Sequence, residues 1–374
     1  MNESPPPKWW VRLLLILLPI VLLVGCLETA GYLWEERTAA GPLGWTLVAS
    51  RRLNLEVQGN PEQPYYLFEP NEDYEWEGIP VHIGSAGFRT EEFALPKPAG
   101  TYRILTIGDS TTFGWRVEQA ETYGKQLEQE LNSQNNNLAY EVINAGVPGW
   151  TLEASRNFLL DKGFGYEPDA IVLAITVVND MTTAPPIKSE NPLFAWLRDK
   201  TYGWSFVTTQ LRFLAARQVG PEAIPNLNPR QDAKAYYPIR TDNPIYNTVW
   251  GFVADMAEAS QAHNIPFYII VFPTAFQVNS SNHPNTAQQV LSERAAAAGI
   301  PIIDLLPIYK AACAEMAADA CEGYENALFA DIWMHPNPAG HALAAQEILT
   351  SWTFIGLTQD GKLTDKPKVV IVTG

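Results

Sequence analysis

The chain has 374 residues, which is enough for one large domain or two small ones with a sizeable core. Apolar residues make up 47% of it, and 12 Trp, 15 Tyr and 15 Phe favour a packed globular body over a disordered chain. The 25 Lys and Arg stand against 41 Asp and Glu, a formal net charge of −16. This balance argues against a nucleic-acid partner, because phosphate binding needs a basic surface.

The N-terminus carries a membrane-targeting pattern. Lys8 and Arg12 precede an uncharged apolar run over residues 13–27. About 15 apolar residues behind a basic flank fit the core of a signal peptide, whereas a full membrane span needs roughly 20. Apolar and aromatic residues continue through Trp34, so we expect residues 1–38 to form an uncleaved signal anchor. By the positive-inside tendency, the rest of the chain is then extracytoplasmic, in the periplasm or at the cell surface.

The three cysteines leave two questions open. Residues 23–26 read LVGC and resemble a bacterial lipobox, which would make Cys26 a lipidated first residue instead of an apolar residue of the anchor. The other two, Cys313 and Cys321, would suit a disulfide in an oxidising compartment. On one continuous helix they would lie about 12 Å apart, too far to bond, so a bridge requires a turn between them. A disulfide and two free thiols both fit the sequence.

Residues 39–100 differ in composition from the rest of the chain. They are rich in Pro, Gly and aromatic residues, with short extended candidates at 65–67 and 81–83. We interpret them as a strand-and-loop extension that packs on the main domain, where the turn sequence GSAGFR at 84–89 begins a docking segment.

From Thr101 onward, strands alternate with helices. The run DAIVLAIT at 169–176 is almost continuously apolar, as expected for a strand buried in a parallel sheet. The predicted strands are residues 103–107, 141–144, 169–176, 266–272 and 300–304, and the predicted helices are residues 122–134, 151–162, 247–263, 286–298 and a last helix that begins near Pro338. This order predicts a parallel sheet with helices on both faces, within one domain over residues 101–355.

An insert over residues 181–241 interrupts this alternation and is too long for an ordinary connection. Its apolar and aromatic clusters follow the third strand, at the carboxyl edge of the sheet where such folds bind ligands. A lid or acyl-binding wall and a helical hairpin packed elsewhere on the core both fit it. Residues 356–374 are expected to be a C-terminal tail.

Residues 104–114, ILTIGDSTTFG, place Ser110 at the end of a strand. A nucleophile elbow G-x-S-x-G would need glycine where Thr112 stands, and a P-loop would need a lysine after Gly114. The remaining G-D-S-T-T-F-G resembles the first sequence block of the SGNH (GDSL) hydrolase family. The resemblance implies a flavodoxin-like three-layer α/β/α sandwich with a parallel sheet.

Later blocks of that family have counterparts in the same order. NAGVPG at 144–149 resembles the second block and puts Gly149 at the oxyanion position. VVND at 177–180 resembles G-x-N-D, with Asn179 in place but Val177 where the family has glycine.

The last block, D-x-x-H, resembles DIWMHPN at 331–337. His335 matches the family histidine, but Asp331 lies four residues before it instead of three. The resemblance implies Ser110 as nucleophile, His335 as general base and Asp331 as the group that orients it, with Asp304 in reserve. The implied oxyanion donors are the N–H groups of Ser110 and Gly149 and the side chain of Asn179.

The resulting prediction is a membrane-anchored serine hydrolase that cleaves an acyl ester of a lipid or glycan, as an esterase, lipase or deacetylase. Two alternatives stay open: an O-acyltransferase of envelope glycans that uses the same acyl-serine, and a non-catalytic polysaccharide-binding relative. No H-E-x-x-H or paired C-x-x-C occurs, so we expect no metal and no organic cofactor. His341 is expected to pack or cap, and Asp109 to hold the turn at Ser110.

Overall fold

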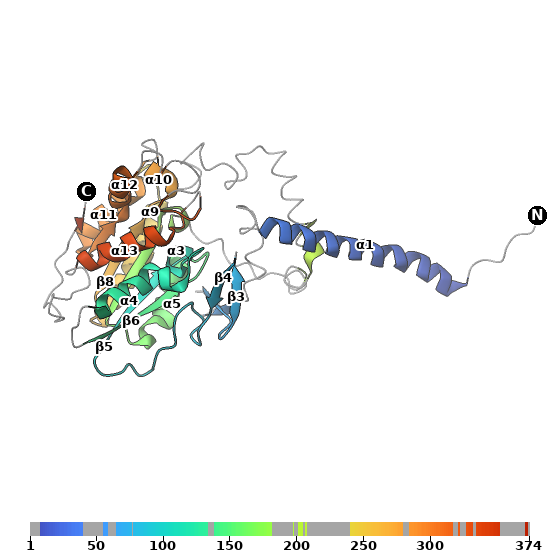
Figure 1. The fold of residues 1–374 in the computed structure, drawn as a ribbon, viewed down its shortest axis with the longest axis horizontal. Helices are drawn as coiled ribbons and strands as arrows, with labels where there is room; N and C mark the ends of the chain where they lie inside the picture. Colours follow the sequence, from blue (N-terminus) through green and yellow to red (C-terminus); the bar gives the residue numbers. More distant parts are fainter. Residues whose placement is uncertain are drawn as a thin grey trace, which may run out of the picture. The chain divides into compact units, whose positions relative to one another are not determined.

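Figure 1 shows the fold in a computed structural model of the chain. The structure describes residues 8–39, 55–58, 65–76, 78–133, 138–181, 197, 201–204, 206–207, 240–279, 284–316, 321, 327–331, 334–351 and 371–372. The chain divides into two compact units, Met1–Asn54 with Ile187–Ile224, and Leu55–Pro186 with Pro225–Gly374.

The first unit contains one long apolar helix, α1 (Trp9–Ala39). Its stretch Leu15–Leu33 has a mean hydropathy of 2.0 and is almost entirely exposed, and at 1.5 Å per residue it is about 28 Å long. That length matches the hydrocarbon core of a bilayer, which fits a membrane anchor or a signal sequence. Near the end of this stretch the Glu28 carboxylate accepts the N–H groups of Tyr202 and Gly203, which belong to the insert. Most of the insert, and with it the predicted lid or wall, lies outside the described residues.

The second unit is built on a parallel sheet (Figure 1). Its strands lie in the order β6, β5, β7, β8, β9, β10, and every neighbouring pair is parallel. They are β5 (Thr101–Gly108), β6 (Ala139–Gly146), β7 (Ala170–Thr176), β8 (Phe267–Phe272), β9 (Ile302–Asp304) and the short edge strand β10 (Ile371–Val372). The first five strands follow the flavodoxin-like order 2-1-3-4-5. In this order β6 is added on one side of β5 and the later strands on the other, so the switch point lies between β5 and β7. The predicted fold is therefore confirmed.

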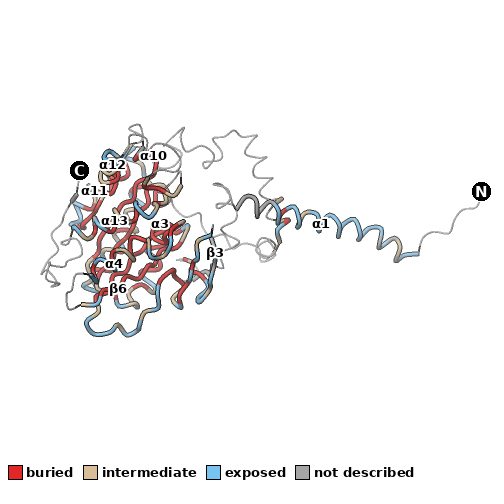
Figure 2. Tube along the Cα trace, in the orientation of Figure 1, coloured by how far each residue is buried: buried red, intermediate tan, exposed pale blue. Residues whose placement is uncertain are grey.

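Helices cover both faces of the sheet. Since strand residues alternate between faces, Ile104 packs with Leu127 on one side, while Leu105 lies near Leu159 and Gly163 on the other. The first layer holds α4 (Tyr123–Ser133), α12 (Leu305–Glu315) and α13 (Pro338–Thr350), and the second holds α5 (Leu152–Asp161), α9 (Ile245–Ala262) and α11 (Thr286–Ala298). Every residue of β7 and β8 is buried, and Figure 2 shows the buried residues gathered in the interior of this unit.

Three local predictions needed correction. Residues 371–372, expected within a C-terminal tail, form the edge strand β10, which pairs with β9. Strand β6 continues to Gly146 instead of ending at Asn144, because its ladder with β5 runs as far as the pair Gly108 and Gly146. Helix α12 was not predicted at all. Its Pro307 lies in the first turn, where proline is tolerated, and the Asp304 carboxylate caps this turn by accepting the Leu306 N–H at 3.0 Å.

The described part of the extension from Leu55 onward lies against the main domain within the same unit. It forms two antiparallel hairpins, β1 (Leu55–Gln58) with β2 (Tyr65–Phe68), and β3 (Asp73–Trp76) with β4 (Ile79–His82). The ring of Phe68 stacks on Phe113 at 5.4 Å, and Phe88 meets Phe158 edge-on at 5.1 Å. The Trp150 indole donates to the Tyr66 carbonyl at 2.9 Å. These contacts place β2 beside the loop that follows β6.

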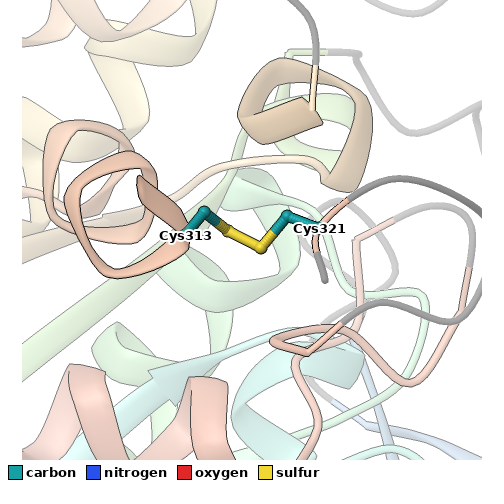
Figure 3. The surroundings of a disulfide bond; sticks show 2 residues. All are labelled: Cys313 and Cys321. Atoms are coloured by element: carbon teal, nitrogen blue, oxygen red, sulfur yellow. A yellow bond between two sulfur atoms is a disulfide. The ribbon is translucent and has the colours of Figure 1, made fainter. Parts of the chain in front are cut away.

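The second unit contains a disulfide between Cys313 and Cys321, whose Cα atoms are 5.8 Å apart (Figure 3). The bridge is possible because α12 ends at Glu315, so the two cysteines do not share one helix. Of the two alternatives the sequence left open, the structure has the bridge. The remaining cysteine, Cys26, is free and exposed on α1.

Candidate active site

Ser110 lies at the carboxyl end of β5, beside the switch point of the sheet, as the first residue of the short helix α3 (Ser110–Phe113). The turn into this helix needs Gly108, because a Cβ there would lie 2.3 Å from the Thr112 hydroxyl. The Asp109 carboxylate accepts the Thr111 N–H at 2.8 Å and so caps the helix. Ser110 itself is 6% exposed, which leaves its hydroxyl in a largely desolvated position.

His335 lies directly at Ser110. The His335 Nε2 atom is 2.8 Å from the Ser110 Oγ atom, although the two residues are 225 positions apart in the chain. On the other side of the ring, Nδ1 is hydrogen-bonded to the Asp331 Oδ2 atom. The side chains of His335 and Asp331 are 13% and 12% exposed. The three predicted residues therefore form one chain of hydrogen bonds.

The loop that carries Asp331 accommodates the extra residue before His335. Phe329 and Pro336 form an antiparallel bridge, and the Ala330 N–H donates to the His335 carbonyl at 2.8 Å. Within this hairpin the Asp331 Oδ1 atom accepts the N–H groups of Met334 and His335. One carboxylate thus holds the loop with one oxygen and the His335 ring with the other. Asp304, the reserve candidate, caps α12 instead.

The three predicted oxyanion donors differ in what they already bind. Among the described residues no acceptor is recorded for the N–H of Ser110 or of Gly149. Gly149 is exposed, and its φ of +82° lies in the left-handed region that favours glycine. The Asn179 amide, by contrast, donates to Asp109 Oδ2 at 3.1 Å and to the Trp150 carbonyl at 2.6 Å. Val177, at the family's glycine position, is buried at the start of α6 (Val177–Asp180).

A pair of buried carboxylates lies beneath the serine. Burial raises the pKa of Asp109, but three donors oppose this by holding its charged form: the Thr111 N–H, the Thr176 hydroxyl and the Asn179 amide. Burial, together with the charge of Asp109, raises the pKa of Asp180 well above its usual range, and the Thr176 N–H donates to its carboxylate at 2.6 Å. The two carboxylates therefore disfavour each other's charged form, and the donors to Asp109, which include the Asn179 amide, offset part of this effect.

Residues 115–117, which the sequence analysis did not single out, connect the serine to the histidine loop. The Trp115 ring lies 5.8 Å from the His335 ring, and Arg116 donates to the Ala330 carbonyl at 2.9 Å. Behind this segment the buried Arg89 guanidinium donates to the carbonyls of Gly114 and Val117 at 2.7 and 2.9 Å. Burial lowers the pKa of Arg89 to about 10, so it is charged at neutral pH. The sequence signal that could have identified Arg89 is its position as a basic residue in the otherwise uncharged docking segment 84–89.

The sequence matches a family model over residues 106–343, the GDSL-like lipase/acylhydrolase family. The chain belongs to this family. Its match spans the serine, the histidine loop and most of the second unit, so this GDSL hydrolase is an ester-cleaving enzyme whose substrates are acyl esters. No curated protein matches the chain.

Solved structures also resemble the chain, at low sequence identity. An acetyl xylan esterase is 16% identical over 67% of this chain and 98% of its own, with a TM-score of 0.42. An acetylxylan esterase from Geobacillus stearothermophilus is 14% identical over 70% of this chain and 97% of its own, with a TM-score of 0.43. A member of the lipolytic G-D-S-L family from Veillonella parvula is 14% identical over 67% and 98%, with a TM-score of 0.39. Likenesses this distant do not extend to the substrate.

His341 gives the GDSL hydrolase a predicted sensitivity to acid. Its ring stacks on Tyr123, its Nδ1 atom accepts the Tyr123 N–H at 3.2 Å, and burial lowers its pKa to about 3. Below pH 6.5 the unfolded chain binds a proton at His341 that the folded chain does not, so the free energy of unfolding falls by about 1.4 kcal/mol per pH unit.

Urea unfolding at pH 7 and pH 5 measures this fall in the free energy of unfolding. We expect His341→Asn, which keeps an acceptor, to lose roughly 2 kcal/mol less than the wild type over that interval. An equal loss in both proteins would contradict the assignment.

Proposed function

We propose that the protein hydrolyses acyl esters through a triad of Ser110, His335 and Asp331. One observation carries the proposal: the Ser110 hydroxyl is 2.8 Å from His335 Nε2, while Nδ1 of the same ring binds Asp331. A serine hydroxyl is a weak nucleophile until a neighbouring base takes its proton, and a base needs a fixed tautomer to do so. Because Asp331 accepts the Nδ1 proton, the lone pair of Nε2 faces the serine.

The steps follow from this arrangement. Ser110 Oγ attacks the ester carbonyl as its proton passes to His335 Nε2, and the Asp331 carboxylate stabilises the imidazolium that forms. His335 then gives the proton to the departing alcohol oxygen, which leaves an acyl-serine. A water molecule then takes the place of the alcohol and attacks the acyl carbonyl as its proton passes to His335 Nε2. The bond to Ser110 Oγ breaks, His335 returns the proton to that oxygen, and the acid is released.

The tetrahedral intermediates of acylation and of deacylation each carry an oxyanion, which is bound by backbone N–H groups. Those of Ser110 and Gly149 have no recorded acceptor among the described residues, which supports this role. Asn179 contributes by exchanging its bond to Asp109 for one to the oxyanion, while its bond to the Trp150 carbonyl keeps the amide in place. Donors of this kind lower the barrier by about 3–4 kcal/mol each.

The same acyl-serine serves a transferase if a sugar hydroxyl replaces water, so the products test the proposal. We expect the purified protein to convert an aryl acetate to acetate, and to keep acetate as the main product when an oligosaccharide is added. An acetylated oligosaccharide as the main product would instead establish an O-acyltransferase. Release of acetate by the wild type no faster than in buffer without protein would leave a non-catalytic, glycan-binding protein.

We further propose that α1 anchors the enzyme with its second unit outside the cytoplasm. The apolar stretch Leu15–Leu33 supports the anchor, and the disulfide between Cys313 and Cys321 supports an oxidising compartment. Washing membranes of producing cells with alkaline carbonate should retain the full chain and release a chain that lacks residues 1–38. Release of both would rule out an anchor.

A further inference from the structure

Strand β2 of the extension is hydrogen-bonded to the loop that carries the predicted oxyanion donor Gly149. The Tyr66 hydroxyl donates to the Pro148 carbonyl at 3.1 Å. In return, the Trp150 indole donates to the Tyr66 carbonyl at 2.9 Å. One residue of the extension is thus joined to both sides of Gly149, one position before it and one after it.

The bond to Pro148 acts on Gly149 through the peptide plane. The Pro148 carbonyl and the Gly149 N–H belong to the same trans peptide group, so they lie in one plane and point in opposite directions. A donor that fixes the carbonyl therefore also fixes the direction of the N–H. It polarises the group as well, because hydrogen bonds through one amide strengthen each other.

The Tyr66 hydroxyl also lies close to the Cα atom of Gly149. A Cβ at this position would lie 2.8 Å from the Tyr66 hydroxyl oxygen, closer than such atoms approach each other. Tyr66 is therefore seated against the glycine itself. Burial, followed by the negative charge of Asp109, raises the pKa of Tyr66, so the hydroxyl keeps its proton and remains a donor at all physiological pH values.

We propose that Tyr66 is a positioning residue for ester hydrolysis, which aims the Gly149 N–H at the oxyanion by holding the Pro148 carbonyl. The inference rests on the proposed function of Ser110. It assigns to the extension, which lies outside the family match at residues 106–343, a part in the catalytic step. Tyr66 acts on the transition state through Gly149, so its loss should change kcat and leave KM nearly unchanged.

The neighbouring tyrosine supplies a matched control. Tyr65 lies on the same strand, and its hydroxyl donates to Asp161 on α5 at 2.5 Å, on a helix that contributes no residue to the triad. Tyr65→Phe and Tyr66→Phe each remove one hydroxyl that makes one side-chain hydrogen bond. A purely structural role of β2 would affect both variants alike.

The experiment measures aryl acetate hydrolysis by the full chain and by both variants. Each rate is divided by the concentration of active sites, obtained by titrating Ser110 with a fluorophosphonate, so that misfolded molecules are excluded from the rate. We expect Tyr66→Phe to lower kcat roughly tenfold at nearly constant KM, and Tyr65→Phe to stay within about twofold of the wild type. A trifluoromethyl ketone, which forms a tetrahedral adduct, should bind Tyr66→Phe weaker by the same factor as kcat/KM falls.

The other possible results separate the positioning role of Tyr66 from the proposed hydrolase activity. Wild-type kcat per titrated site in Tyr66→Phe, or an equal loss in Tyr65→Phe, would reject the positioning role and leave the proposed hydrolase intact. A loss that appears in KM alone would also reject it. A wild type that neither titrates nor turns over would reject the hydrolase itself, and the role of Tyr66 with it.

Discussion

Replacing Ser110 by alanine should lower kcat for ester hydrolysis by about 10⁴- to 10⁶-fold. The variant keeps the backbone donors and the base but has no atom that can form the acyl intermediate. His335 then faces a methyl group in place of the hydroxyl 2.8 Å away. Hydrolysis of an aryl acetate by the purified protein, followed by absorbance, gives the rate directly.

A second serine provides the control for this substitution. Ser155 is 2% exposed on α5, so Ser155→Ala also removes a buried hydroxyl from a helix of the same domain. We expect its kcat to stay within about threefold of the wild type, since the change touches none of the reacting groups. Residual activity of Ser110→Ala above about a hundredth of the wild type would show that another group carries the reaction.

Asp331→Asn should have the second-largest effect, a loss in kcat of about 10³- to 10⁴-fold. The amide of an asparagine would donate to His335 Nδ1, which moves the ring proton to Nε2 and leaves no lone pair for the serine. KM should change little, because Asp331 contacts the loop and the ring but is not placed to contact substrate.

Asp304→Asn separates this effect from a general loss of a carboxylate. Asp304 caps α12 by accepting the Leu306 N–H, and burial raises its pKa to about 6. Asparagine is also a good N-cap residue, so this variant should keep its kcat within about threefold. If Asp304→Asn lost more activity than Asp331→Asn, the reserve assignment made from the sequence would be the right one.

The sheet was predictable because its strands are long runs of apolar residues at the spacing of a parallel α/β fold. The position of Ser110 was also predictable, because the glycine two residues before it marks the end of the strand. The structure gives the reason for that glycine: a Cβ at Gly108 would lie 2.3 Å from the Thr112 hydroxyl. His335 was assigned from its resemblance to the last block of the family, and the helix expected after it is capped by Asn337, which accepts the N–H groups of Ala339 and Gly340.

Other features depend on contacts that no local pattern records. The one-residue shift of Asp331 is absorbed by the bridge between Phe329 and Pro336, which joins residues the sequence gives no reason to pair. Arg89 and Tyr66 gain their partners only when the extension docks, because those partners are backbone carbonyls of distant loops. A carbonyl acceptor is present at every residue, so sequence alone does not indicate which one a side chain will meet.

The nucleophile is the central claim, and covalent labelling tests it most directly. A fluorophosphonate probe transfers its phosphonyl group to an activated serine oxygen as fluoride leaves, and mass spectrometry of the digested protein locates the adduct. We predict one adduct per chain, on Ser110, and none in Ser110→Ala under the same conditions. Equal labelling of wild type and Ser110→Ala, or an intact and unlabelled Ser110 in a protein that hydrolyses ester, would contradict the account.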